Sequence, residues 1–283
     1  MKYKYVAGFL GALLVFGNLA ARADDDAALN SDVQAVITKV RALAQDNKQD
    51  AKDYADAMKG LDDIVAKHKD QKADQLAQVL FLKASIYEEV TTNADKTDKA
   101  IAVVEQIKKD YPDTKFAQNA DKIIAGFREG EAADKIQAGL VAGAPFPDFN
   151  EVDVEGKPVS VAGHKGKVVL VDFWATWCGP CRAEFPNVKK TYETYHDKGF
   201  DIVGVSLDED KGKLADYIKD NGVTWQQYFD GMGWTNKLAL KYGIRSIPAT
   251  ILVDGDGKIL GKNIRGDDLP AAISKALASK GGA

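Results

Sequence analysis

Residues 168–181 read VVLVDFWATWCGPC, and the two cysteines of this 283-residue chain both lie in that stretch. The apolar run predicts a buried strand. Pro180 predicts the start of a helix over 180–196, because proline is favoured at the first position of a helix. A thiolate is the nucleophile of disulfide exchange, and a helix N-terminus stabilises that anion through unpaired N–H groups and the helix dipole. This order predicts that Cys178 is a nucleophile. Cys181, one turn later, can attack the mixed disulfide that Cys178 forms.

A zinc site and an inert structural disulfide are the other uses of such a pair. Zinc needs two further ligands, but the chain has no second cysteine pair, and His68, His164 and His196 lack ligand-like spacing. His68 stands in the charged run KHKDQK and is expected to be a solvated helix residue. A disulfide at this spacing closes too short a loop to add much stability. The sequence therefore predicts a redox-active Cys178–Cys181 pair with no metal and no cofactor.

The first residues have the three parts of a secretory signal. Lys2 and Lys4 give a positive start, residues 6–19 are apolar, and Ala21-Arg22-Ala23 fits an A-x-A cleavage site. An uncleaved membrane anchor is the alternative. We expect cleavage after Ala23 and export to the periplasm or another oxidising compartment.

The composition limits the class of protein. Hydrophobic residues make up 45% of the chain and charged residues 28%, as in ordinary globular proteins. The formal net charge of −4 argues against a nucleic-acid partner, which requires a basic face. Two cysteines are too few for a disulfide framework in a protein of this length.

Strands and helices alternate in the C-terminal half. The predicted elements are a hairpin over 151–161 that turns at Glu155-Gly156, strands at 167–175, 200–208, 249–254 and 258–264, and helices at 180–196, 212–221, 236–242 and 268–279. This alternation predicts βαβ units and a central mixed sheet flanked by helices. A cluster of glycine and proline over 139–147 predicts a linker. The expected domains are therefore 24–139 and 140–283.

Residues 30–139 predict helices only, because apolar residues recur at spacings of three and four with few helix breakers. The ammonium of Lys83, on one such stripe, is expected to reach water. A shift of 43 positions places Leu61 on Val104 and Ala77 on Ala120, which indicates a repeated helical hairpin. A plain helical bundle is the alternative. The segment KKDYPDTKFAQNA resembles the turn between repeats of tetratricopeptide-like periplasmic proteins, although the spacing exceeds their usual length of about 34 residues.

The C-terminal half resembles a known family. VVLVDFWATWCGPC is similar to the active-site strand and motif of thioredoxin, and KYGIRSIPATILVD, at 241–254, to the thioredoxin stretch that carries its cis-proline. The segment from about 143 to 280 more closely resembles exported TlpA/ResA-type thiol-disulfide oxidoreductases. It shares their opening GAPFPDF, the Asp-Gly-rich hairpin, the helix after GVSLDED, and Glu184. The resemblance implies a thioredoxin fold for this half, preceded by an all-α domain of helical hairpins.

The resemblance also implies roles for residues around the cysteines. Pro248, after Ile247, is expected to form a cis peptide bond that faces the cysteines and lets the backbone pair with an incoming chain. Asp172 aligns with the buried thioredoxin aspartate that relays a proton to or from Cys181, although many TlpA-like proteins carry another residue there. Glu184 matches a glutamate that ResA-type proteins place near the pair, where burial raises the pKa of a carboxyl. The alternatives are a satisfied buried polar group for Asp172 and a solvated helix residue for Glu184.

The remaining aromatic and turn residues are divided between substrate contact and packing. Trp177, Gly179 and Pro180 are expected to contact the substrate together with Ile247 and Pro248. In contrast, the other three tryptophans are expected to be packing residues: Trp174, Trp225 and Trp234.

These features predict an exported enzyme that reduces protein disulfides. C-G-P-C is the motif of thioredoxin, whose potential of about −270 mV is reducing, whereas strong disulfide oxidants lie near about −120 mV. The family implies disulfide-containing protein substrates and a membrane thiol-electron donor as partners. One alternative is a partner-binding scaffold with a thioredoxin-like docking module, and another is a thiol peroxidase. The helical half is a candidate for binding a partner protein.

Overall fold

The computed structural model describes residues 24–280, which form two compact units that divide after Glu131. The predicted signal sequence falls on residues 1–23 and lies outside the described residues. Within the described part of the chain, none of the helices has the length and apolar character that a bilayer span requires. Helix α7 begins at Ala120, continues past the division and ends at Gly139, so the domain boundary at 139/140 stays a prediction.

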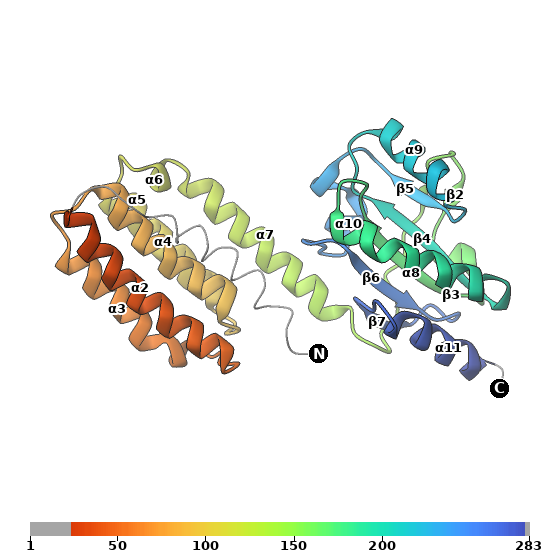
Figure 1. The fold of residues 1–283 in the computed structure, drawn as a ribbon, viewed down its shortest axis with the longest axis horizontal. Helices are drawn as coiled ribbons and strands as arrows, with labels where there is room; N and C mark the ends of the chain where they lie inside the picture. Colours follow the sequence, from red (N-terminus) through yellow and green to blue (C-terminus); the bar gives the residue numbers. More distant parts are fainter. Residues whose placement is uncertain (1–23, 281–283) are drawn as a thin grey trace. The chain divides into compact units, whose positions relative to one another are not determined.

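The first unit is helical, as predicted (Figure 1). Its elements are α2 (Asp24–Gln45), the short 3-10 helix η1 (Ala51–Tyr54), α3 (Ala55–Lys67), α4 (Ala73–Val90), α5 (Lys96–Asp110), α6 (Lys115–Gln118) and the first part of α7 (Ala120–Gly139). The central helix α4 is buried on two sides. Leu82 and Ile86 pack with α2 and α3, whereas Leu80 and Ala84 pack with α5, α6 and α7. The buried apolar surface of α4 is therefore wider than a single helical stripe.

The helical hairpins of this unit follow the 43-residue shift. The shift carries α3 onto α5 and α4 onto α6 and α7. The paired positions are buried in both hairpins, Leu61 with Val104 and Ala77 with Ala120. This agreement is expected of a repeated hairpin, which buries equivalent positions against successive neighbours.

Two polar side chains of the first unit differ from the expectation. The His68 side chain is only 9% exposed, and its Nε2 lies 2.8 Å from Asp32 Oδ2, so His68 is not a solvated residue. Lys83 Nζ donates to both carboxylate oxygens of Asp62 at 2.7 Å instead of extending freely into water. Both partners lie on neighbouring helices, whose packing the sequence pattern does not specify.

The second unit has the predicted mixed sheet. Its strands are β1 (Glu151–Val152), β2 (Pro158–Val159), β3 (Val168–Trp174), β4 (Phe200–Ser206), β5 (Gln227–Phe229), β6 (Ala249–Val253) and β7 (Ile259–Lys262). Its helices after α7 are α8 (Gly179–Tyr195), α9 (Lys211–Asn221), α10 (Lys237–Lys241) and α11 (Asp268–Lys280). Strands β1 and β2 form the predicted antiparallel hairpin. The larger sheet has the order β5-β4-β3-β6-β7. Strands β3, β4 and β5 are parallel to one another, β6 is antiparallel to β3, and β7 is antiparallel to β6.

Strand β3 lies in the middle of the larger sheet, and its side chains enter hydrophobic cores on both faces of that sheet. Val169, Val171 and Phe173 belong to one core, whereas Val168 and Leu170 belong to the other. The second core contains residues of α8 and α11, which cover that face (Figure 1). Successive side chains of a strand point to opposite faces, so a strand covered on both sides needs a continuous apolar run. The central mixed sheet flanked by helices that was predicted for this half is confirmed.

The glycine- and proline-rich segment is not a free linker. Phe146 and Phe149 are buried in the core of the second unit, and the Phe146 ring stacks on Tyr242 with the ring centroids 5.0 Å apart. Gly143 N donates to Ile259 O, which ties the segment to β7. The segment predicted as a linker therefore packs against the sheet of the second unit through the aromatic residues beside its prolines. Strand β5 was not predicted, since its three residues show no alternation and become a strand by pairing with β4.

Candidate active site

The two cysteines lie where β3 ends and α8 begins, and they form a disulfide bond. Cys178 is the N-cap of α8, and its Sγ accepts a hydrogen bond from the backbone N–H of Cys181 at 3.2 Å. Pro180 lies in the first turn, where its missing N–H leaves no helical bond unmade. The helix N-terminus therefore directs an N–H group and the positive end of its dipole at the Cys178 sulfur.

The peptide bond between Ile247 and Pro248 is cis. Pro248 precedes β6 and lines a pocket that Cys181 also lines. The sequence places Pro248 67 positions after Cys181, and the pairing of β6 with β3 brings the two residues to the same end of the sheet.

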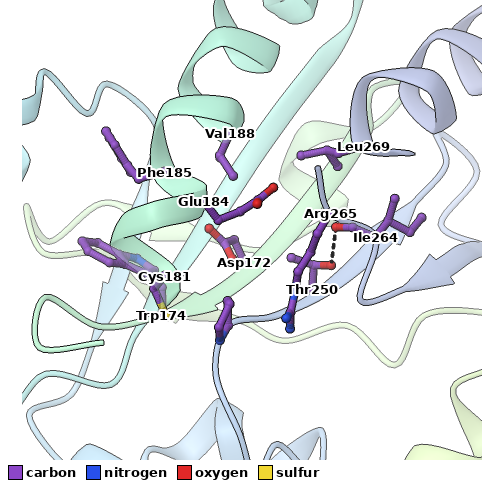
Figure 2. A pocket seen from close by; sticks show the side chains of 11 residues that line it. Asp172, Trp174, Cys181, Glu184, Phe185, Val188, Thr250, Ile264, Arg265 and Leu269 are labelled. Atoms are coloured by element: carbon purple, nitrogen blue, oxygen red, sulfur yellow. Dashed lines mark hydrogen bonds between the residues drawn. The ribbon is translucent and has the colours of Figure 1, made fainter. Parts of the chain in front are cut away.

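The pocket beneath the disulfide is small. Its volume is about 20 Å³, which is room for about one water molecule. Its lining combines apolar side chains with Asp172 from β3, Glu184 from α8 and Arg265, which follows β7 (Figure 2). Val168 and Leu170 of β3 lie on the face of the sheet that α8 covers. Asp172 comes two positions after Leu170, so its side chain lies on the same face and lines the pocket.

The carboxyl of Asp172 has a raised pKa. Burial raises its pKa from the usual 3.8 to about 7, the nearby positive charge of Arg265 opposes this rise, and the negative charge of Glu184 adds to it. A carboxyl with a pKa near 7 is present in both protonation states at neutral pH. It can accept or donate a proton beside Cys181.

Glu184 has a fixed orientation. Its Oε1 accepts hydrogen bonds from Asn187 Nδ2 and from the backbone N–H of Gly266, each at 2.8 Å. These bonds tie the first turns of α8 to the segment before α11. Glu184 is therefore half-buried and held at the pocket, so its side chain is not freely solvated.

Arg265 is a pocket residue that the sequence analysis missed. Burial lowers the pKa of its guanidinium, and its buried Nε has no hydrogen-bond partner. Arg265 stands 84 positions after Cys181 in the short segment between β7 and α11, and no motif marks it. Only the antiparallel pairing of β7 with β6 returns this segment to the cysteines.

The structure separates the predicted site residues into two groups. Cys181, Asp172, Glu184 and Pro248 line the pocket. The others do not line it: Cys178 is buried in the disulfide, Trp177, Gly179 and Pro180 are exposed beside it, and Ile247 is half-buried against the core.

Of the three tryptophans that were predicted to be packing residues, two are buried. Trp174 and Trp225 are buried, and Trp174 Nε1 donates to Gln227 Oε1 at 2.9 Å. Trp234 is not a packing residue, because it is 46% exposed and lies next to Trp177, with ring centroids 6.0 Å apart.

Comparisons with known proteins match the half of the chain that carries this pocket. The Redoxin family model matches residues 141–278. Thiol-disulfide oxidoreductase ResA of Bacillus thuringiensis subsp. konkukian is 30% identical over 135 residues, which are 48% of this chain and 76% of that protein. ResA of Bacillus subtilis is 33% identical over 119 residues, or 42% of this chain and 64% of that protein. The thioredoxin domain of a thiol-disulfide oxidoreductase from Bacteroides vulgatus is similar in structure, with 39% identity, a TM-score of 0.45, and coverage of 48% of this chain and 97% of that chain.

Proposed function

This chain belongs to the ResA-type thiol-disulfide oxidoreductases of the thioredoxin superfamily, and from that premise we propose that it reduces protein disulfides through a Cys178–Cys181 dithiol. The observation that carries the proposal is a C-G-P-C disulfide at the start of α8, directly above a one-water pocket that contains a carboxyl with a pKa of about 7.

The first step uses the helix N-terminus. In the reduced enzyme the Cys178 thiolate accepts the N–H of Cys181 and is stabilised by the dipole of α8. The thiolate attacks one sulfur of the substrate disulfide, a new S–S bond joins Cys178 to the substrate, and the other substrate sulfur leaves as a thiolate that takes a proton from water.

The second step uses the pocket. Ionised Asp172 accepts the proton of the Cys181 thiol, either directly or through the water for which the pocket has room. The Cys181 thiolate then attacks Cys178 Sγ, the bond to the substrate breaks, and the second substrate sulfur leaves as a thiolate and is protonated. The substrate gains two electrons and two protons, and the enzyme returns to the disulfide form. A thiol donor, which the family implies is at the membrane, then reduces the Cys178–Cys181 disulfide.

The direction of the reaction is tested by the reduction potential of the Cys178–Cys181 pair, measured by equilibration against dithiothreitol buffers. We expect a potential near that of thioredoxin, about −270 mV, since the motif is C-G-P-C. A potential near about −120 mV would contradict the proposal, because such a pair donates its disulfide to other proteins.

The charges around Asp172 predict how activity depends on pH. As a base, Asp172 gives a rate that rises with pH around its pKa of about 7. Glu184→Gln removes a charge that raises this pKa, so the rise should move to lower pH. Arg265→Gln removes a charge that lowers it, so the rise should move to higher pH. The measurement is the pH dependence of kcat/KM on a disulfide peptide.

Arg265→Lys is the matched control for this pair of variants, because it keeps the positive charge and should shift the profile less than Arg265→Gln. Shifts of the same sign in Glu184→Gln and Arg265→Gln would mean that the pKa of Asp172 does not set the pH dependence of kcat/KM.

Two further expectations concern export and the helical half. Export is supported by the signal-like residues 1–23 and is checked by whether the mature protein begins at Asp24. Partner binding by the helical half is supported by its repeated hairpins. It is checked by whether a protein lacking residues 24–131 keeps its activity on a small disulfide and loses activity on a native partner.

A further inference from the structure

Large apolar side chains are exposed next to the disulfide. Trp177, in the active-site motif, is 54% exposed, and Trp234, in the loop between β5 and α10, is 46% exposed. Their rings lie 6.0 Å apart, and Met232, in the same loop as Trp234, is 56% exposed. Exposed apolar residues that gather beside a reactive group mark an interaction site. We call Trp177, Met232 and Trp234 the apolar platform.

The segment that carries Trp177 is held in place by a buried carboxylate. Asp208 is 3% exposed and accepts hydrogen bonds from the backbone N–H of Thr176 at 3.1 Å and from the Thr176 hydroxyl at 2.6 Å. The hydroxyl of Ser206, at the end of β4, also donates to Asp208 at 2.7 Å. Trp177 is therefore presented by a segment that is fixed to β4.

The loop that carries Met232 and Trp234 is fixed to the same strand end. Asn236 is fully buried, and its Nδ2 donates to the Ser206 carbonyl at 3.3 Å and to Asp230 Oδ1 at 2.9 Å. Asp230 also accepts the backbone N–H of Met232 at 3.0 Å. These hydrogen bonds hold the loop in a conformation in which the side chains of Met232 and Trp234 are exposed.

Gly233 allows this turn. Its φ is +55°, a conformation that a residue with a Cβ atom adopts only with strain. Two loops that are far apart in sequence thus meet at Ser206 and hold two tryptophans in a preformed arrangement. Preformed contact residues lose little conformational entropy when a ligand binds.

We propose that the apolar platform binds an apolar side chain next to the reacting cysteine of the substrate, so that the enzyme prefers disulfides in apolar polypeptide segments. This inference rests on the proposed function, because a substrate sulfur that reaches Cys178 must bring its neighbouring residues over Trp177. The occupant is therefore the flanking chain of the disulfide substrate. Trp234 and Met232 act as specificity-determining residues, and they take no part in the bond-making steps.

The test compares two synthetic disulfide peptides that differ in one residue beside the cysteine, Leu in one and Ser in the other. For the wild-type chain we expect kcat/KM to be about tenfold higher on the Leu peptide, mainly through KM, which is the scale expected for burying one aliphatic side chain. Trp234→Ala should reduce this preference to about twofold or less, and Trp234→Phe should retain most of it. Met232→Ala should reduce it by a smaller factor.

Leu260→Ala is the matched control, since Leu260 is an exposed apolar residue on β7, at the opposite edge of the sheet from β5. Its preference for the Leu peptide should equal that of the wild type. Equal rates of the wild type on both peptides, or an undiminished preference in Trp234→Ala, would overturn the inference and leave the proposed function standing. If the wild type reduces neither peptide, the proposed function itself fails. A second copy of the chain is the other occupant that the platform could bind, and sedimentation of the wild type and of Trp234→Ala tests it. If the wild type is a dimer and the substitution dissociates it, the platform binds a second copy and the inference is overturned.

Discussion

Asp172→Asn should stabilise the oxidised protein by up to about 4 kcal/mol at pH 8 and by almost nothing at pH 4. The pKa of Asp172 is about 7 in the folded protein, against a usual value of 3.8 that applies to the unfolded chain. Between these two values the folded state keeps the proton and the unfolded state has lost it, so stability falls as the pH rises from about 4 to about 7. One pKa unit corresponds to about 1.4 kcal/mol, so the full difference has an upper bound of about 4 kcal/mol. An amide of the same shape has no charge to bury.

Urea unfolding of the oxidised wild type and of Asp172→Asn at pH 4 and pH 8 measures this effect. Glu184→Gln is a useful companion, because it lowers the pKa of Asp172 and should show a smaller stability loss with rising pH than the wild type. Stabilisation of the same size at both pH values would mean that the Asp172 carboxyl is not protonated in the folded protein at pH 4, contrary to its raised pKa.

Cys181→Ser should reduce turnover on the order of 10³-fold or more and accumulate the enzyme covalently bound to its substrate. The variant keeps the Cys178 thiolate at the start of α8, so the first attack proceeds, but no thiol is present to break the mixed disulfide. Cys178→Ser should lose a comparable amount of activity without forming an adduct. Removing this short disulfide loop costs little chain entropy, so both variants are expected to fold.

Non-reducing electrophoresis and intact mass of the two variants, each incubated with a disulfide peptide, separate the roles of the cysteines. One substrate half bound per Cys181→Ser chain is the expected product. An adduct that forms on Cys178→Ser and not on Cys181→Ser would exchange the two roles and would require a different account of the helix N-terminus.

Much of the thioredoxin-like half could be predicted because its signals are local. The apolar run of β3, the C-G-P-C turn and the start of α8 follow one another within residues 168–181, and each depends on neighbours in the sequence. The mixed sheet followed from the alternation of strand and helix patterns. Asp172 and Pro248 were predicted from resemblance, and the burial of Trp174 and Trp225 agrees with their apolar character.

The sequence by itself determined the strand–C-G-P-C–helix unit and the fold class of both halves, because these depend on periodicity and on adjacent residues. The tertiary structure alone decided that Arg265 enters the pocket with Asp172 and Glu184, and that Trp234 lies exposed against Trp177. It also decided that the glycine- and proline-rich segment packs on the sheet and that His68 meets Asp32. Each of these contacts joins residues that are distant in the chain, and their physical basis is strand pairing and helix packing, which no local pattern encodes.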